Sequence, residues 1–127
     1  MHICLIGSLR DIDRIQQIAR ELQKKGHTTI VPVDASENRF SDRKQTKAEF
    51  MKKMFDNIKN CDAVLAVNDA SRGGQQGYIG PNTFLQLGMG MSLGKALFSL
   101  ARWDTRLPYN EELEAMSINT LDLKLPF

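Results

Sequence analysis

The sequence predicts an α/β protein with a doubly wound parallel sheet of about five strands, in a flavodoxin-like or Rossmann-like order, and helices on both faces. Short apolar runs of strand length alternate with segments whose apolar residues recur at i, i+3 and i+4. One run, residues 63–67, is apolar throughout, which is typical of a strand covered on both faces in a parallel sheet. We find no internal repeat or linker, so we expect a single domain over residues 1–127.

The first part of the chain supplies two strands and a helix. Residues 3–6 form an apolar run, and residues 12–22 carry a helical apolar pattern that ends before Gly26, because glycine favours the position after a helix. Residues 28–33 are rich in β-branched side chains and are predicted to form a second strand, which Pro32 weakens near its end.

A long helix should follow the polar loop at residues 34–40. Ser41 or Asp42 can cap it, because both side chains accept hydrogen bonds from the first amides of a helix. One face of this helix is rich in lysine and is expected to be solvated, whereas the other is predicted to pack in the core. The predicted core positions are Ala48, Met51, Met54, Phe55 and Ile58.

A second long helix is predicted after the turn at residues 77–83, with Asn82 or Thr83 as its cap. Apolar residues surround residues 83–93, so we expect this helix to be buried on all sides. Its internal glycines would let a neighbouring helix approach closely at an interface between subunits. Packing within one subunit is the alternative.

The last part of the chain is predicted to form a strand at residues 96–100, a short helix at 111–116 capped by Asn110, and a weak strand at 118–123. The alternative fold is a receiver-like flavodoxin fold. A receiver carries an acidic cluster after its first strand, whereas Gly7 stands there in this sequence.

Composition narrows the partners that we expect. With 42% hydrophobic and 25% charged residues the chain is an ordinary globular one, and a net charge of +2 gives no reason to expect nucleic acid or an anionic membrane as a partner. The N-terminus has neither a basic flank nor a long apolar run, so we expect a cytoplasmic protein. Cys4 and Cys61 lack metal-ligand spacing and are expected to be reduced, buried thiols, with no metal bound.

The glycines of the second long helix do not indicate a dinucleotide cofactor. Gly88, Gly90 and Gly94 are spaced GxGxxxG and lie within or at the end of a helix, not in a turn between a strand and a helix. We therefore expect no cofactor.

Three loops that are distant in sequence should meet at one edge of the sheet. Ligands of open parallel sheets bind outside the carboxyl ends of the strands, where the strand order reverses. There Gly7 permits a tight turn, Ser8 offers a hydroxyl, and Arg10 adds a fixed charge beside the first amides of the next helix, which favours a phosphate or a sugar hydroxyl. The other candidates for substrate binding are Asn68, Gly80, Asn82 and Thr83, with Asp69 beside them.

Residues 77–95, Gly-Tyr-Ile-Gly-Pro-Asn-Thr-Phe-Leu-Gln-Leu-Gly-Met-Gly-Met-Ser-Leu-Gly-Lys, resemble the signature helix of the nucleoside 2-deoxyribosyltransferase-like family, which includes nucleoside-monophosphate N-glycosidases. Leu107-Pro108-Tyr109, followed by residues 112–116, is similar to the family's segment after its fourth strand. The Gly-Ser-x-Arg at residues 7–10 resembles the loop with which the glycosidase branch contacts a 5′-phosphate. The resemblance implies a nucleoside or nucleotide as the small-molecule partner. It also implies a homodimer or higher homo-oligomer.

Gln86 occupies the position at which the resembled family has its nucleophilic glutamate. A carboxylate can form a glycosyl-enzyme intermediate, whereas a neutral amide is a far poorer nucleophile. One hypothesis is therefore a protein that binds a nucleoside, a nucleotide or a related ribosyl ligand without the family's catalysis. The alternative is an active deoxyribosyltransferase or N-glycosidase that uses another carboxylate, Asp69 first and Glu112 second. Asn68 and Asp69 can also be read as a turn pair that contacts no ligand.

Overall fold

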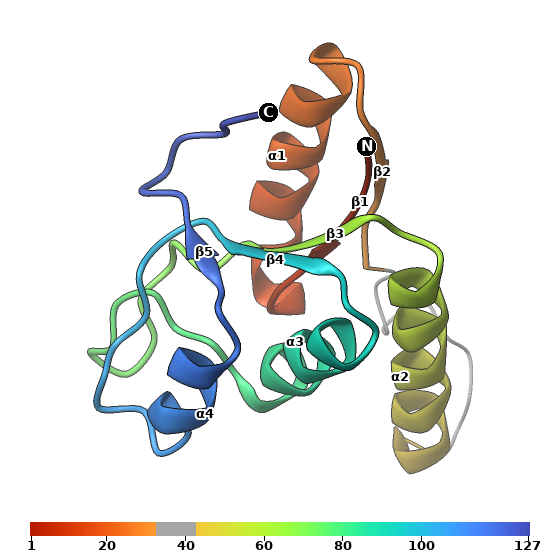
Figure 1. The fold of residues 1–127 in the computed structure, drawn as a ribbon. Helices are drawn as coiled ribbons and strands as arrows, with labels where there is room; N and C mark the ends of the chain where they lie inside the picture. Colours follow the sequence, from red (N-terminus) through yellow and green to blue (C-terminus); the bar gives the residue numbers. More distant parts are fainter. Residues whose placement is uncertain (33–42) are drawn as a thin grey trace.

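The computed structural model describes residues 1–32 and 43–127, with the side chains of residues 43–46 left aside, and within them it contains one five-stranded sheet (Figure 1). The strands are β1 (His2–Ile6), β2 (Thr28–Ile30), β3 (Ala63–Ala66), β4 (Ala96–Ser99) and β5 (Asn119–Thr120). Every pairing is parallel, and the order is β2-β1-β3-β4-β5. The predicted doubly wound α/β fold is thus confirmed in its flavodoxin-like order.

Helices cover both faces of the sheet (Figure 1). They are α1 (Ile12–Lys24), α2 (Arg43–Lys59), α3 (Pro81–Ser92) and α4 (Asn110–Ala115), and a 3-10 turn, η1 (Leu9–Asp11), precedes α1. Figure 1 shows α1 on one face and α2, α3 and α4 on the other. None of the helices in the described part of the chain is long and apolar enough to cross a membrane.

The core has two halves because successive side chains of a strand point to opposite faces of the sheet. In β1, Ile3 and Leu5 pack with α1, whereas Cys4 and Ile6 pack with the helices of the other face. All of β3 is buried, as its uninterrupted apolar run predicted. The thiols of Cys4 and Cys61 are free and buried.

The second strand is shorter than predicted, and one predicted core position is wrong. β2 ends at Ile30, ahead of Pro32, because proline has no amide hydrogen to donate to the sheet. In α2 the buried side chains of the described part are Phe50, Met54 and Ile58, whereas Ala48 is exposed, because the helix is rotated towards the Phe50 side of the predicted stripe. The polar loop predicted at residues 34–40, and the caps predicted at residues 41 and 42, lie outside the described residues.

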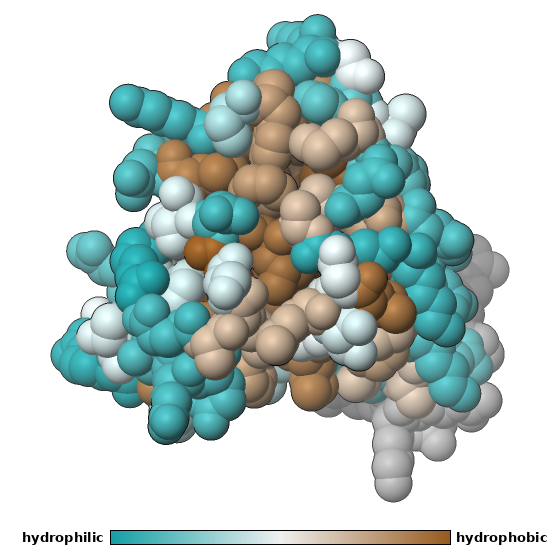
Figure 2. Space-filling model, in the orientation of Figure 1, coloured by the Kyte–Doolittle hydropathy of each residue, from teal (hydrophilic) through white to brown (hydrophobic). Residues whose placement is uncertain are grey.

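The prediction that α3 is buried on all sides is wrong for a single chain. Leu85, Met91 and Leu93 at its end are 49%, 51% and 41% exposed, and Figure 2 shows brown, apolar atoms at the surface in the region of α3. The opposite side of the helix lies directly on the sheet. A Cβ on Gly90 would come within 2.8 Å of Leu97 Cδ2. Gly90 therefore serves packing within the chain, which was the alternative explanation of the helix glycines.

The short helix α4 begins one residue earlier than expected. Its N-cap is Tyr109, so the predicted cap Asn110 is already its first helical residue. The Asn110 Oδ1 instead accepts a hydrogen bond from Trp103 Nε1 at 2.8 Å. The last strand, β5, spans only Asn119–Thr120 of the predicted residues 118–123.

Two loops that follow neighbouring strands touch closely, and Gly77 makes this contact possible. A Cβ on Gly77 would lie only 2.0 Å from the carbonyl oxygen of Arg102, and the backbone φ of Gly77 is +64°. Gly74, in the same loop, has a φ of +78° but no atom within 4 Å of a Cβ built on it. Both glycines adopt a left-handed backbone, but only at Gly77 would a side chain also clash with a neighbouring loop.

We predict that Gly77→Ala destabilises the protein much more than Gly74→Ala. Each substitution carries the cost of a left-handed backbone, about 1–2 kcal/mol. Gly77→Ala adds a steric clash with backbone, about 1–3 kcal/mol more. Urea unfolding followed by circular dichroism measures both free energies of unfolding. Equal losses for the two variants would contradict the close contact between the loops.

Candidate functional site

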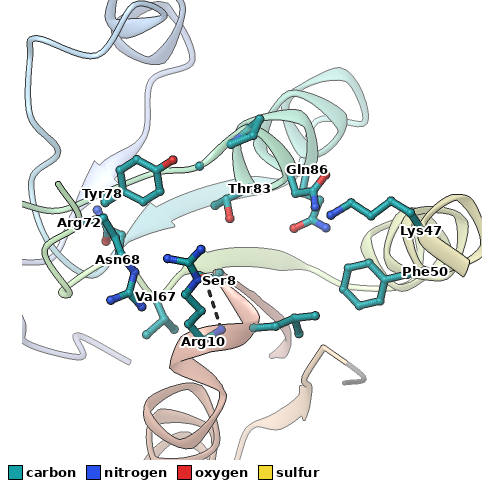
Figure 3. A pocket seen from close by; sticks show the side chains of 15 residues that line it. Ser8, Arg10, Lys47, Phe50, Val67, Asn68, Arg72, Tyr78, Thr83 and Gln86 are labelled. Atoms are coloured by element: carbon teal, nitrogen blue, oxygen red, sulfur yellow. Dashed lines mark hydrogen bonds between the residues drawn. The ribbon is translucent and has the colours of Figure 1, made fainter. Parts of the chain in front are cut away.

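A cavity of about 410 Å³ lies at the carboxyl ends of β1 and β3, the two strands between which the strand order reverses. We call it the switch-point cavity. Figure 3 shows its lining side chains, which come from the loop after β1, from α2, from the loop after β3 and from α3. The cavity brings together eight of the predicted site residues: Gly7, Ser8, Arg10, Asn68, Gly80, Asn82, Thr83 and Gln86.

The loop after β1 is held tightly against the sheet. A Cβ on Gly7 would lie 2.9 Å from the carbonyl oxygen of Val67, so a larger residue does not fit there. Ser8 caps η1, because its Oγ accepts a hydrogen bond from the backbone N–H of Arg10 at 3.3 Å. The Arg10 side chain extends from this turn towards the cavity (Figure 3). The turn thus places a fixed positive charge at one wall.

Asn68 lines the cavity but uses its side chain for the backbone. Its Nδ2 donates to the carbonyl oxygens of Ala101 at 2.8 Å and of Gly77 at 3.3 Å, and its Oδ1 accepts from the N–H of Ala101 at 2.9 Å. The residue is only 3% exposed. Both donor hydrogens of the amide are therefore occupied, and Asn68 joins the loops after β3 and β4.

Asp69 lies apart from the other candidates. It is not among the residues that line the switch-point cavity, and its Oδ2 accepts a hydrogen bond from Arg14 Nε of α1 at 2.9 Å. Glu112, on α4, is exposed and does not line the cavity either. Neither carboxylate therefore reaches the site in this arrangement.

The first turn of α3 differs from the prediction in its cap. Gly80 is the N-cap and Pro81 the first helical residue, so the predicted caps Asn82 and Thr83 lie inside the helix. Proline is common at this first position because its fixed φ suits a helix. An amide hydrogen there would have no partner in the helix, so its absence in proline costs nothing. Gln86 lies in the next turn, only 4% exposed, with its side chain at the cavity wall.

Sequence reasoning missed three polar residues of the site: Lys47, Arg72 and Tyr78. Lys47 belongs to the lysine-rich part of α2 that was expected to be solvated, and Figure 3 shows its side chain directed towards Gln86. Arg72 comes from the glycine-rich loop after β3, where its Nη2 contacts Asp11 Oδ1 at 2.6 Å. No local pattern marks these residues, because only the packing of α2 and of this loop brings them to the cavity.

The lining carries positive charge. Arg10, Lys47 and Arg72 line the cavity, and no aspartate or glutamate does so within residues 1–32 and 47–127. Of these three cations only Arg72 has an ion-pair partner among the described side chains, so no carboxylate there balances the charges of Arg10 and Lys47. In the same part of the chain no three histidine, cysteine, aspartate or glutamate residues cluster as metal ligands. The site is therefore suited to an anion.

Neither a protein-family profile nor the sequence of a curated protein matches the chain. Solved structures do. The chain is similar to the CMP N-glycosidase BcmB of Clostridium botulinum, with a TM-score of 0.58 and 20% identity over 94% of this chain and 86% of that one. It is also similar to the 2-deoxyribosyltransferase of Bacillus psychrosaccharolyticus, with a TM-score of 0.56 and 20% identity over 79% and 72%.

A third similar structure is the 2-deoxyribosyltransferase of Leishmania mexicana, with a TM-score of 0.54 and 19% identity over 78% of this chain and 63% of that one. Identities near 20% establish a shared fold and leave the chemistry to be argued from the site. The chain therefore has the fold of the 2-deoxyribosyltransferases and of this CMP N-glycosidase, as its signature segment predicted.

Proposed function

We propose that this protein binds a nucleoside, a nucleoside monophosphate or a related ribosyl compound in the switch-point cavity, without the glycosyl transfer that a carboxylate at position 86 would perform. The location and size of the cavity support binding, because small ligands of such sheets occupy clefts of a few hundred Å³ at the point of reversal. The fold supports a ribosyl compound, since the similar structures include proteins named for CMP and for deoxyribosyl transfer.

One observation carries the proposal for binding without the family's chemistry. Gln86 is a buried amide at the cavity wall, and no carboxylate accompanies it among the described lining residues. Glycosyl transfer passes through a transition state with positive charge on the sugar, which a carboxylate stabilises and attacks. An amide supplies neither the negative charge nor an efficient nucleophile.

The alternative is an active deoxyribosyltransferase or N-glycosidase that employs Asp69. A general base or nucleophile must come within hydrogen-bond reach of the reacting atom or of a bridging water. Asp69 is instead paired with Arg14 and does not line the cavity. Activity would thus require the carboxylate to leave Arg14, and we place this function second.

We also propose that the protein forms a homodimer or higher homo-oligomer through the exposed side of α3. Leu85, Met91 and Leu93 leave about half of their surface in contact with water, which is unusual for three large apolar side chains on a single helix. A second copy of the chain would cover them by symmetry.

Binding is testable by isothermal titration calorimetry with nucleosides and nucleoside 5′-monophosphates. We expect saturable binding of at least one nucleotide, and Arg10→Gln should weaken it about tenfold, or ~1.4 kcal/mol, because a charge at the cavity wall is lost. Arg20→Gln is the matched control, since Arg20 is exposed on α1 away from the cavity. No heat of binding with any of these compounds would contradict the proposal.

Catalysis is tested by restoring the carboxylate. We expect wild-type protein to release base no faster than a sample without protein, and Gln86→Glu to release base at least about tenfold above that background, because one nucleophile is worth several powers of ten in rate. Chromatography of the free base is the measurement. Gln17→Glu, the same change on the exposed side of α1, should remain inert. Rapid turnover by the wild type would instead favour the alternative, with Asp69→Asn as the next variant.

The oligomeric state is measured by light scattering at micromolar concentration. The wild type should have at least twice the mass of one chain, and Leu85→Lys should shift it towards the monomer by placing a charge in an apolar contact. Leu123→Lys is the control, since Leu123 is 59% exposed and lies outside α3. A monomeric wild type would overturn this part of the proposal.

A further inference from the structure

Positive side chains enter the switch-point cavity from two sides. Figure 3 shows Arg10 and Arg72 on the side formed by the loops after β1 and β3, and Lys47 on the side formed by α2. These cations belong to separate elements, so no single turn of the chain brings them together. A monophosphate has one anionic group, whereas the cavity offers positive charge on two sides.

The side formed by α2 and α3 has several donors for an anion besides Lys47. Gln86 is neutral, and its amide nitrogen can donate where a glutamate would repel. The N–H groups of Asn82 and Thr83 lie in the first turn of the twelve-residue helix α3, where no carbonyl of the helix can accept from them. The positive end of the α3 dipole lies at the same cavity. Lys47, the Gln86 amide and the start of α3 therefore favour negative charge at the wall that α2 and α3 form.

The opposite side is a second centre of positive charge. Arg10 has no ion-pair partner among the described side chains, whereas the charge of Arg72 is partly balanced by Asp11 at 2.6 Å. The Ser8 hydroxyl lies on the same loop as Arg10 and offers a further hydrogen bond to a phosphate oxygen. Each side is thus able to hold one anionic group.

We infer, on the basis of the proposed function, that the ligand is a ribosyl compound with two anionic groups. One is held by Arg10 and Arg72, and the other by Lys47 of α2 together with the first amides of α3. The pentose occupies the space between them. A ligand of this kind neutralises both sides at once, and a cavity of about 410 Å³ is of the size that small phosphorylated ligands require. The Gln86 amide is then a binding group that can donate a hydrogen bond to the second anion. A glutamate at this position would repel that anion.

Two matched pairs of probes test the inference by calorimetry in buffer free of divalent cations. The first pair is ribose 5-phosphate and 5-phosphoribosyl 1-pyrophosphate. The second is a nucleoside 5′-monophosphate and the corresponding 3′,5′-bisphosphate. We expect the member with two anionic groups in at least one pair to bind at least about tenfold more tightly than the member with one, because charge-assisted hydrogen bonds are the strong ones. The pair that shows this preference tells whether a base is part of the ligand.

Variants of α2 make the test specific. Lys47→Gln should reduce the preference for the probe with two anionic groups to about threefold or less, while the affinity for the probe with one anionic group changes little. Lys53→Gln removes the same charge from an exposed position of α2 that does not line the cavity, and it should keep the full preference. Gln86→Glu should lower the affinity for the probe with two anionic groups more than the affinity for the probe with one.

The outcomes separate this inference from the proposed function. Equal affinities within both pairs, or a preference that survives in Lys47→Gln, would overturn the inference and leave nucleotide binding intact. If the preference is lost equally in Lys47→Gln and Lys53→Gln, it results from long-range attraction to the charge of α2. That result would also overturn the inference. If no probe binds at all, the proposed function fails and the inference fails with it.

Discussion

The architecture around the cavity depends on one contact, the close approach of the loop after β3 to the loop after β4. Asn68 joins them through three hydrogen bonds to the backbone of Gly77 and Ala101, and Gly77 lies so near the Arg102 carbonyl that no side chain fits between. Because the Asn68 amide is buried, breaking one of these bonds would leave a polar group without a partner, which costs about 1–3 kcal/mol. The contact fixes where α3 begins and hence where Gln86 lies.

Much of the signature segment serves this placement and has no direct part in ligand contact. Gly77 packs on Arg102, and Ile79 is buried, with its carbonyl oxygen accepting a hydrogen bond from the Tyr109 hydroxyl. Phe84 stacks on the same Tyr109 ring, with 4.5 Å between the ring centroids. Much of the segment that carries the sequence resemblance therefore packs α3 against the loop before α4. A fold can persist on such packing after the residue that performs the chemistry has changed.

The charges of the site are consistent with this separation of fold from chemistry. Carboxylate-based glycosyl transfer needs negative charge beside a sugar that becomes positive. In this chain the described lining is cationic, and the two carboxylates considered from sequence lie elsewhere, Asp69 beside Arg14 and Glu112 at the surface of α4. A site of this sign attracts a negatively charged ligand and stabilises it in the bound state. It opposes the development of positive charge on a sugar.

The sequence by itself determined the fold class, most elements and eight residues of the cavity, because the apolar periods of strands and helices are local and the crevice position follows from parallel topology. The tertiary structure decided what depends on distant contacts. The packing of α2 brings Lys47, which is exposed as expected, to the cavity, and Asp69 pairs with Arg14 outside the site. The tertiary structure also leaves one side of α3 exposed. These outcomes depend on how whole elements are rotated and docked, which no local pattern of residues encodes.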